Sequence, residues 1–176
     1  IQINGLGQRF HDETQGYSEA AVEVLKQPQA QAWCVFDDPV LKLARGFPDF
    51  VELMGVGAVR SFDAIADLAA WVGCDPAALA HTMQSVRAGA DPLTGRVFKR
   101  SLQGPWHALR VTGALFHTQG GLCINAQAQV LNAQGQPFAN LFAAGGAARG
   151  VSGTSVWGYL SGNGLLSAVA GGRMTP

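Results

Sequence analysis

Charge of either sign is scarce in this sequence. Only 14% of its 176 residues are charged, and 12 Lys and Arg balance 12 Asp and Glu, so the formal net charge at pH 7 is zero. Neither sign forms a long run, which excludes an extended electrostatic surface for nucleic acid or an anionic membrane. We therefore expect the partner to be a small-molecule substrate or another protein surface.

Cysteine is equally rare, and no apolar run reaches the ~18 residues of a membrane span. Cys34, Cys74 and Cys123 lie far apart and form no CxxC pair, which favours free thiols in a reducing compartment over disulfides or a metal site. The chain also begins without an initiator Met and without the features of a signal peptide, so we expect it to begin inside a longer protein or after processing. The expected location is the cytoplasm, and abundant Ala with more Arg than Lys suggests a bacterial source.

Hydrophobic residues are plentiful, at 48%, and their spacing predicts the elements of the first hundred residues. The predicted elements are a hairpin over 1–10, a helix over 17–26 capped by Ser18, a buried strand over 32–38, and helices within 40–90 capped by Ser61 and Asp75. Residues 89–105 are rich in Gly, Pro and charge, which favours a loop at a domain boundary. Short strands and a terminal helix over 162–171 follow. The sequence thus predicts an α+β fold.

A glycine-rich segment, residues 140–168, carries the main chemical signal. Its sequence, NLFAAGGAARGVSGTSVWGYLSGNGLLSA, predicts a buried strand, a Gly/Ser loop and the start of a helix. Glycine lets backbone approach a ligand closely, and a helix N-terminus offers free N–H groups to an anionic or electron-rich group. The alternative, that these glycines only turn the chain, stays open on this segment alone.

Three known loop motifs are absent from the sequence. Residues 162–167 end in Ser where GxGxxG needs its last Gly, and no acid follows about 20 residues later. The sequence contains neither a GxxxxGKS or GxxxxGKT loop nor a GxSxG element. The sequence therefore contains no Rossmann fingerprint, and the missing motifs disfavour phosphoryl transfer and hydrolysis as its activity.

Several motifs together resemble one flavoprotein family. They are FHTQGGL followed by IN within 116–125, AQVLNAQGQPFANLFAAGG at 128–146, GYLSGNGLLSA at 158–168 and NGLGQRFHDE at 4–13. Their order and spacing resemble FAD-dependent oxidoreductase family 2, which contains fumarate reductases, tricarballylate dehydrogenase and 3-ketosteroid dehydrogenases. The resemblance covers essentially the whole chain.

The resemblance implies two partial domains. Residues 1–104 would form part of a capping, substrate-covering domain, and 105–176 the C-terminal β-rich portion and last helix of a Rossmann-like FAD domain. In the family, FAD is also held by a GxGxxG loop in an N-terminal half that this chain lacks. We therefore expect FAD in the full-length family but not in this fragment, with the N-terminal half as a missing partner. Apolar surface left uncovered on 141–146 and 164–172 predicts self-association.

The resemblance also assigns cofactor-binding residues. They are Ala144, Gly145, Gly146, Ser161, Gly162, Asn163, Gly164 and Leu165. Ala144 to Gly146 would lie beside the ribityl and pyrophosphate groups, and the helix start near Gly164 would face the flavin pyrimidine edge. Gly146 stands where the family commonly has Glu, which weakens that contact.

Catalytic and substrate residues follow from the same comparison. His117 occupies the place of a substrate-binding histidine, and Tyr17 occupies the place where fumarate reductases have a proton-donating arginine and ketosteroid dehydrogenases a tyrosine. Tyr159 likewise replaces an arginine, and Arg149 could reach the substrate. Arg9 and Glu13 are expected to stabilise the capping fold, and His11 to lie on the surface.

The implied activity is hydride transfer between flavin and a carbon adjacent to a carbonyl. The two tyrosines at arginine positions disfavour a dicarboxylate and favour a ketosteroid-like or enoate substrate, and the fragment alone is expected to be inactive. The alternative function is a stand-alone ligand-binding or protein-interaction module without flavin.

Overall fold

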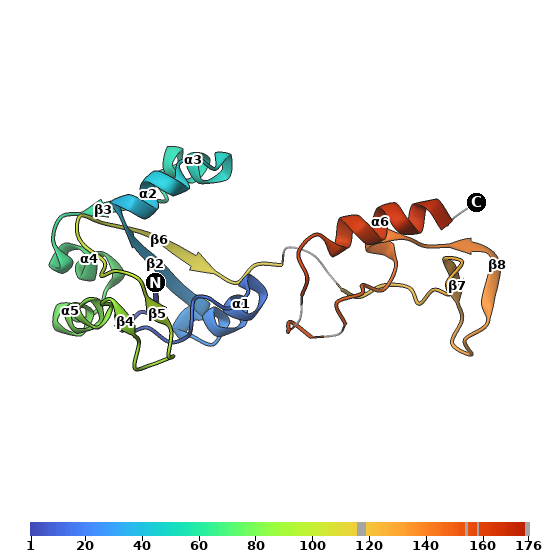
Figure 1. Ribbon diagram of the computed structural model, residues 1–176, viewed down its shortest axis with the longest axis horizontal. Helices are drawn as coiled ribbons and strands as arrows, with labels where there is room; N and C mark the ends of the chain where they lie inside the picture. Colours follow the sequence, from blue (N-terminus) through green and yellow to red (C-terminus); the bar gives the residue numbers. More distant parts are fainter. Residues whose placement is uncertain (116–118, 154, 158, 175–176) are drawn as a thin grey trace. The chain divides into compact units, whose positions relative to one another are not determined.

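The computed structural model describes residues 1–115, 119–153, 155–157 and 159–174. The chain divides into two compact units, a first unit of Ile1–Gly113 and a second unit of Ala114–Pro176. Figure 1 shows their elements in sequence colours. Each unit is described by itself.

The first unit is built on a four-stranded antiparallel sheet. Its strand order is β1 (Gln2–Ile3), β2 (Gln31–Asp37), β6 (Trp106–Thr112) and β3 (Arg60–Phe62). β2 forms because an apolar, aromatic-rich run of high strand propensity precedes Asp38-Pro39, which ends it. The run is buried along most of its length, and the strand therefore lies in the middle of the sheet.

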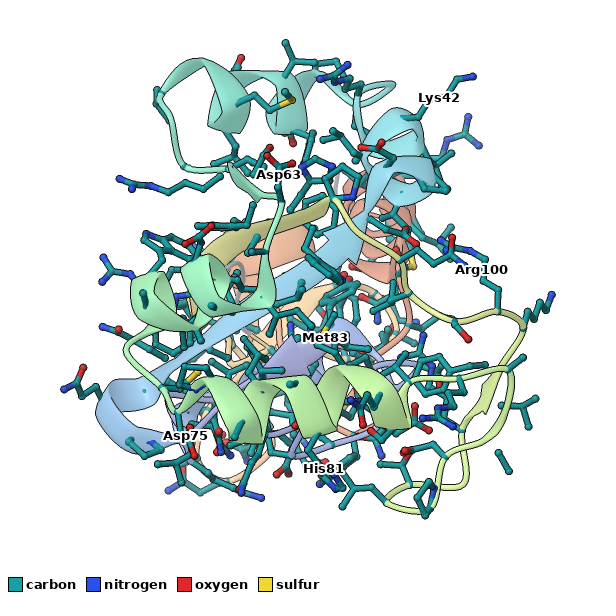
Figure 2. The ribbon with its side chains drawn as sticks, turned by 90° about the vertical axis from the view of Figure 1, so that its left-hand side faces the viewer. Lys42, Asp63, Asp75, His81, Met83 and Arg100 are labelled. Carbon is teal, nitrogen blue, oxygen red and sulfur yellow. The ribbon has the colours of Figure 1, made fainter. Side chains whose placement is uncertain are left out.

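Two helices cover one face of this sheet and enclose the core. They are α4 (Ile65–Val72) and α5 (Pro76–Ser85). Leu68 and Leu79 of these helices are fully buried against Val35 and Ala108 of the strands. Figure 2 shows Met83 on the side of α5 that faces the sheet, and His81 on its outer side. The apolar spacing of the two helices thus positions the core.

The remaining elements of the first unit surround this layer pair. They are α1 (Tyr17–Leu25), the 3₁₀ turn η1 (Pro28–Ala30), α2 (Asp38–Ala44), α3 (Pro48–Gly55) and the small hairpin of β4 (Gly89–Ala90) and β5 (Val97–Phe98). α1 contacts β2 and β6. Because the β4–β5 hairpin lies within 89–105, that segment is not simply a loop.

Local signals predicted several of these elements and misplaced others. Asp75 caps α5 as predicted, since its carboxylate accepts the Ala77 N–H at 3.0 Å. Ser61 caps no helix: it lies in β3, which pairs with β6, and α4 begins after Ala64. The N-cap of α1 is Gly16 and not Ser18. Tertiary pairing and backbone geometry therefore override the capping preference at these positions.

The first ten residues form one strand and a turn instead of the expected hairpin. Only Gln2–Ile3 is a strand, and it pairs with β2. The Asn4 side-chain oxygen accepts the N–H groups of Leu6 and Gln8, at 3.0 and 3.1 Å. Gly7 adopts a φ of +73°. The turn is therefore stabilised by the Asn4 side chain, with no returning strand.

The first compact unit extends beyond the segment 89–105, to Gly113. The division into a capping domain and an FAD domain at 104/105 stays a prediction. β6 belongs to the first unit because all seven of its residues, Trp106–Thr112, pair with β2.

The second unit contains one hairpin and one long helix. The hairpin joins β7 (Gln129–Leu131) to β8 (Pro137–Phe142), and the 3₁₀ turn η2 (Gly145–Ala147) packs against α6 (Asn163–Met174). Its small core contains Val130, Ala143 and Ala148. The predicted turn and terminal helix are therefore present in this unit. The predicted strand is present as β8, but it is exposed along most of its length and not buried as expected.

Within the described part of the chain, no helix combines the length and apolar character needed to cross a membrane.

Candidate functional site

The glycine-rich segment encloses a cavity of about 400 Å³ in the second unit. Six of the eight residues that the sequence assigned to the cofactor line this cavity, and Tyr159 lines it too. The six are Gly145, Gly146, Gly162, Asn163, Gly164 and Leu165. These residues come from η2 and from the start of α6, which are separated in the sequence by the Gly/Ser loop. The fold therefore brings the two ends of the segment to one place.

Close packing of α6 on η2 shapes one wall of this cavity. Gly145 has a φ of +56°, and a Cβ there would lie 3.0 Å from Ala168 Cβ. A Cβ on Gly171 would lie 2.7 Å from Ala144 Cβ. The backbone of the Ala144–Gly145 segment therefore lies so close to α6 that only glycine fits at Gly145 and Gly171.

The first turn of α6 is held in place at its N-terminal end. Gly162 precedes it with a φ of +85°. The Asn163 N–H donates to the Leu160 carbonyl at 3.3 Å, and the buried Asn163 amide donates to Ser152 Oγ. The first intrahelical bond runs from Leu166 N–H to the Gly162 carbonyl, at 3.1 Å. The N–H groups between Asn163 and Leu166 therefore have no acceptor within the helix.

Those N–H groups belong to Gly164 and Leu165, both of which line the cavity. A helix N-terminus carries about half a positive charge, which favours an anionic or electron-rich group nearby. Gly164 adds access, because a Cβ there would meet nothing within 4 Å. The cavity can therefore accept a planar or anionic group against backbone donors.

A second cavity of about 320 Å³ adjoins the first and shares Gly145, Ala148, Asn163 and Ser167 with it. Ala144 and Arg149, which the sequence also assigned, line this second cavity. Most of its other lining residues are apolar. Ser161 is exposed and precedes Gly162. All assigned cofactor residues and both assigned substrate residues thus belong to the second unit.

Of the two assigned catalytic residues, the structure describes only Tyr17. Tyr17 is the first residue of α1 in the first unit, with 57% of its surface exposed. His117 lies outside the described residues. The geometry of the candidate site is therefore described without His117.

Sequence reasoning missed four residues that line the first cavity: Gln119, Ala148, Gly150 and Ser167. The Gly150 N–H donates to the Gln119 carbonyl at 3.0 Å. Ser152 accepts from Asn163. The signals that could have found them are the motif in which Gln119 precedes Gly120-Gly121 and, for the others, the glycine-rich segment 140–168.

Arg9 and Glu13 form a buried ion network in the first unit. Arg9 donates to both Glu13 carboxylate oxygens, at 2.9 and 2.7 Å, and forms an ion pair with Asp91 at 2.8 Å. Arg96 adds a 2.7 Å bond to Glu13. Burial raises the pKa of Glu13, but hydrogen bonds from Arg9 and from the Gln2 N–H outweigh it and lower the pKa to about 2. These contacts stabilise the fold.

His11 is buried, contrary to its expected surface position. It is only 6% exposed, and its Nε2 lies 2.8 Å from Gln2 Oε1. The side chain also stacks on Phe10. Burial lowers the pKa of His11. Gln2 of β1, nine residues earlier in the sequence, holds the imidazole in place. Its alternating position in a polar stretch gave no hint of this.

Comparisons with known proteins place the chain in a family. The model of the FAD binding domain family matches residues 1–165. A probable fumarate reductase of Shewanella frigidimarina is 34% identical over 183 residues, which cover 99% of this chain and 30% of that protein. The chain belongs to the FAD-binding domain family, as its motifs predicted. Its class is that of the FAD-dependent oxidoreductases of family 2, whose full-length members bind FAD.

Solved structures agree with this assignment. The open conformation of a flavocytochrome c3 fumarate reductase matches with a TM-score of 0.76 and 32% identity, over 99% of this chain and 31% of that one. The 3-ketosteroid Δ1-dehydrogenase of Sterolibacterium denitrificans shares the fold, with a TM-score of 0.72 and 24% identity over 99% and 37%. The predicted mixture of helix and sheet is thus confirmed. The chain spans about a third of these relatives.

Proposed function

We propose that the second unit forms one wall of an FAD site in an oxidoreductase that transfers hydride between the flavin and a carbon adjacent to a carbonyl. The observation that carries this proposal is the glycine-lined cavity at the N-terminus of α6. Its backbone donors and lack of side-chain bulk fit part of a flavin. Membership of an FAD-binding family supports the same cofactor.

The backbone at the start of α6 would hold the flavin pyrimidine edge. FAD, when bound, supplies the hydride acceptor or donor. The N–H groups of Gly164 and Leu165 would stabilise the negative charge that reduction places on that edge, since the helix N-terminus carries partial positive charge. No side-chain acid or base is needed for this role.

The Ala144–Gly146 segment would hold the ribityl and pyrophosphate groups. A Cβ on Gly146 would meet nothing within 4 Å, so the backbone there is open to close approach. Gly146 cannot supply the carboxylate that many relatives have at this position. Contacts to this part of the cofactor therefore depend on backbone in this chain.

Two residues of the second unit and two further residues are assigned to substrate recognition and proton transfer. Tyr159 lines the first cavity and Arg149 the second. Tyr17 would exchange a proton with substrate through its phenol, and His117 would donate to the substrate carbonyl. Two tyrosines at positions where dicarboxylate-reducing relatives carry arginines favour a ketosteroid-like or enoate substrate.

The rest of the FAD site is assigned to polypeptide beyond this chain. The chain covers only 30% of the probable fumarate reductase that it matches, and it contains no complete GxGxxG loop. The proposal therefore predicts that residues 1–176 alone neither retain FAD nor turn over substrate. The complete protein would do both.

Tyrosine substitutions test the activity. The chain has only two tyrosines, so Tyr17→Phe and Tyr159→Phe in the flavin-loaded protein remove one hydroxyl each. We expect Tyr17→Phe to lower kcat about 10²-fold or more on a ketone or enoate substrate, because it removes proton transfer. Tyr159→Phe should mainly raise KM. An unchanged kcat in Tyr17→Phe, with normal flavin content, would contradict the assignment.

A further inference from the structure

The first unit contains a cavity of its own, about 340 Å³ in volume. Its lining residues are Trp33, Gly57, Ala58, Arg60, Trp71 and Arg110. It lies where β2, β6 and β3 meet the end of α4 and the turn after α3. The volume falls within the ~300–1,000 Å³ of ordinary small-molecule pockets. None of its residues belongs to the flavin or substrate site proposed above.

Strand register gathers the polar residues of this cavity. Trp33 of β2 pairs with Arg110 of β6, and Arg60 of β3 pairs with Ala108 two residues away on β6. Paired residues, and residues two apart on a strand, point to the same face of a sheet. Trp33 and both arginines therefore share the face that α4 and α5 cover, at the end that these helices leave open.

The cavity combines aromatic walls with guanidinium groups. Trp33 is 9% exposed and packs in the core, and Trp71 of α4 is half-buried. The Arg60 guanidinium lies over the Trp71 ring, 5.7 Å from its centroid. Stacking of this kind orients a guanidinium and leaves its N–H edge available to a planar anion.

Arg60 and Arg110 are both exposed to solvent at this cavity. Among the described residues, neither Arg60 nor Arg110 has a carboxylate within ion-pair distance, and none of the lining residues is acidic. By contrast, Arg9 and Arg96 of the same unit form ion pairs with Asp91 and Glu13. An anionic group on a ligand would complete the pair.

We propose that this cavity binds a planar aromatic ligand that carries an anionic group. The aromatic ring would pack against Trp33 and Trp71, where it displaces water from apolar surface. The anionic group would accept charge-assisted hydrogen bonds from Arg60 and Arg110. A purely apolar ligand leaves both guanidinium groups unpaired, and a small inorganic anion leaves the aromatic walls unused.

Benzoate is a suitable probe because it carries both features and little else. The chain has four tryptophans, and their indole N–H signals can be followed separately in a ¹H–¹⁵N spectrum. We expect benzoate to shift the signals of Trp33 and Trp71 saturably and to leave Trp106 and Trp157 in place. Benzamide, its neutral counterpart, and acetate should bind at least about tenfold more weakly, since each loses one class of contact.

Substitutions that remove one guanidinium charge each provide a second test of the proposal. Arg60→Gln and Arg110→Gln should each weaken benzoate binding about tenfold, whereas Arg45→Gln, at an exposed position on α2, should leave it unchanged. Absence of saturable shifts at millimolar benzoate, equal shifts at all four tryptophans, or equal affinity for benzamide would overturn the proposal. If an arginine variant fails to fold, the three-ligand comparison on the unaltered chain decides alone.

Discussion

Arg9 contacts Glu13 through two hydrogen bonds, from Nε at 2.9 Å and Nη2 at 2.7 Å, and this pair is almost fully enclosed. Asp91 and Arg96 extend it into a four-residue network. The network fastens the segment after β1 to the β4–β5 hairpin. Both arginines also lie over the Phe98 ring. These opposite charges stabilise the fold of the first unit, and none of the four residues lines either proposed ligand site.

Acid should destabilise the first unit through Glu13. The folded-state pKa is lowered to about 2 from 4.5, so this stabilisation is fully present above about pH 4.5 and is lost as the pH falls towards 2. Each pKa unit corresponds to about 1.4 kcal/mol, which gives about 3 kcal/mol in total. We expect urea unfolding monitored across pH 2–5 to show this loss.

Glu13→Gln should remove most of that pH dependence. It should also destabilise the unit by about 3 kcal/mol at neutral pH, because it leaves buried guanidinium charge less well paired. Glu52→Gln, at an exposed position on α3, is the control. If both variants keep the stability profile of the unaltered chain, the ion network does not stabilise the fold.

Two adjacent glycines should differ sharply in their tolerance of a methyl group. Gly145→Ala forces a φ of +56° on an L residue and places its Cβ 3.0 Å from Ala168 Cβ. We expect a loss of about 1–3 kcal/mol in the free energy of unfolding of the second unit. Gly146→Ala should be close to neutral, since its Cβ meets nothing within 4 Å. Equal melting temperatures for the two variants would contradict this packing.

The exposed apolar side chains of α6 should drive self-association of the isolated chain. Leu165, Leu166 and Val169 are 79%, 70% and 66% exposed, and their spacing places them together on the helix. We expect sedimentation velocity to show dimers or larger species. A double substitution, Leu165→Gln with Val169→Gln, should reduce association, whereas Leu43→Gln, at a 70% exposed position of α2, should not. A concentration-independent monomer would contradict the prediction.

The sequence predicted features that depend on neighbouring residues. Asp75 capping Pro76–Ser85 needs only the adjacent N–H groups, and the terminal helix follows from local apolar spacing. The joint assignment of Gly145 and Gly164 to one site followed from the family resemblance, since they lie 19 residues apart. The cap and the terminal helix depend only on residues close together in the sequence.

Features set by distant pairing were not predictable in this way. Ser61 resembles an N-cap, but pairing with His107 of β6 makes it a strand residue. His11 lies in a polar stretch, yet Gln2 and Phe10 enclose it. The cavity at Trp33 and Arg110 depends on the register of β2 with β6. A single sequence does not specify that register, so no motif revealed this cavity.

The central claim, that the start of α6 faces the flavin, is tested most directly by the flavin reduction potential of Gly164 variants. In the flavin-loaded protein, Gly164→Asp adds a carboxylate at the cavity, and Gly164→Ala adds the same Cβ without charge. An acid in the first turn favours the helix by about 0.3–1 kcal/mol, so misfolding does not account for an effect of the carboxylate.

The account predicts that Gly164→Asp lowers the two-electron potential, relative to Gly164→Ala, by on the order of 20 mV or more. The added carboxylate opposes the negative charge that reduction places beside this helix start. Equal potentials in the two variants, with both proteins folded and carrying flavin, would contradict the claim.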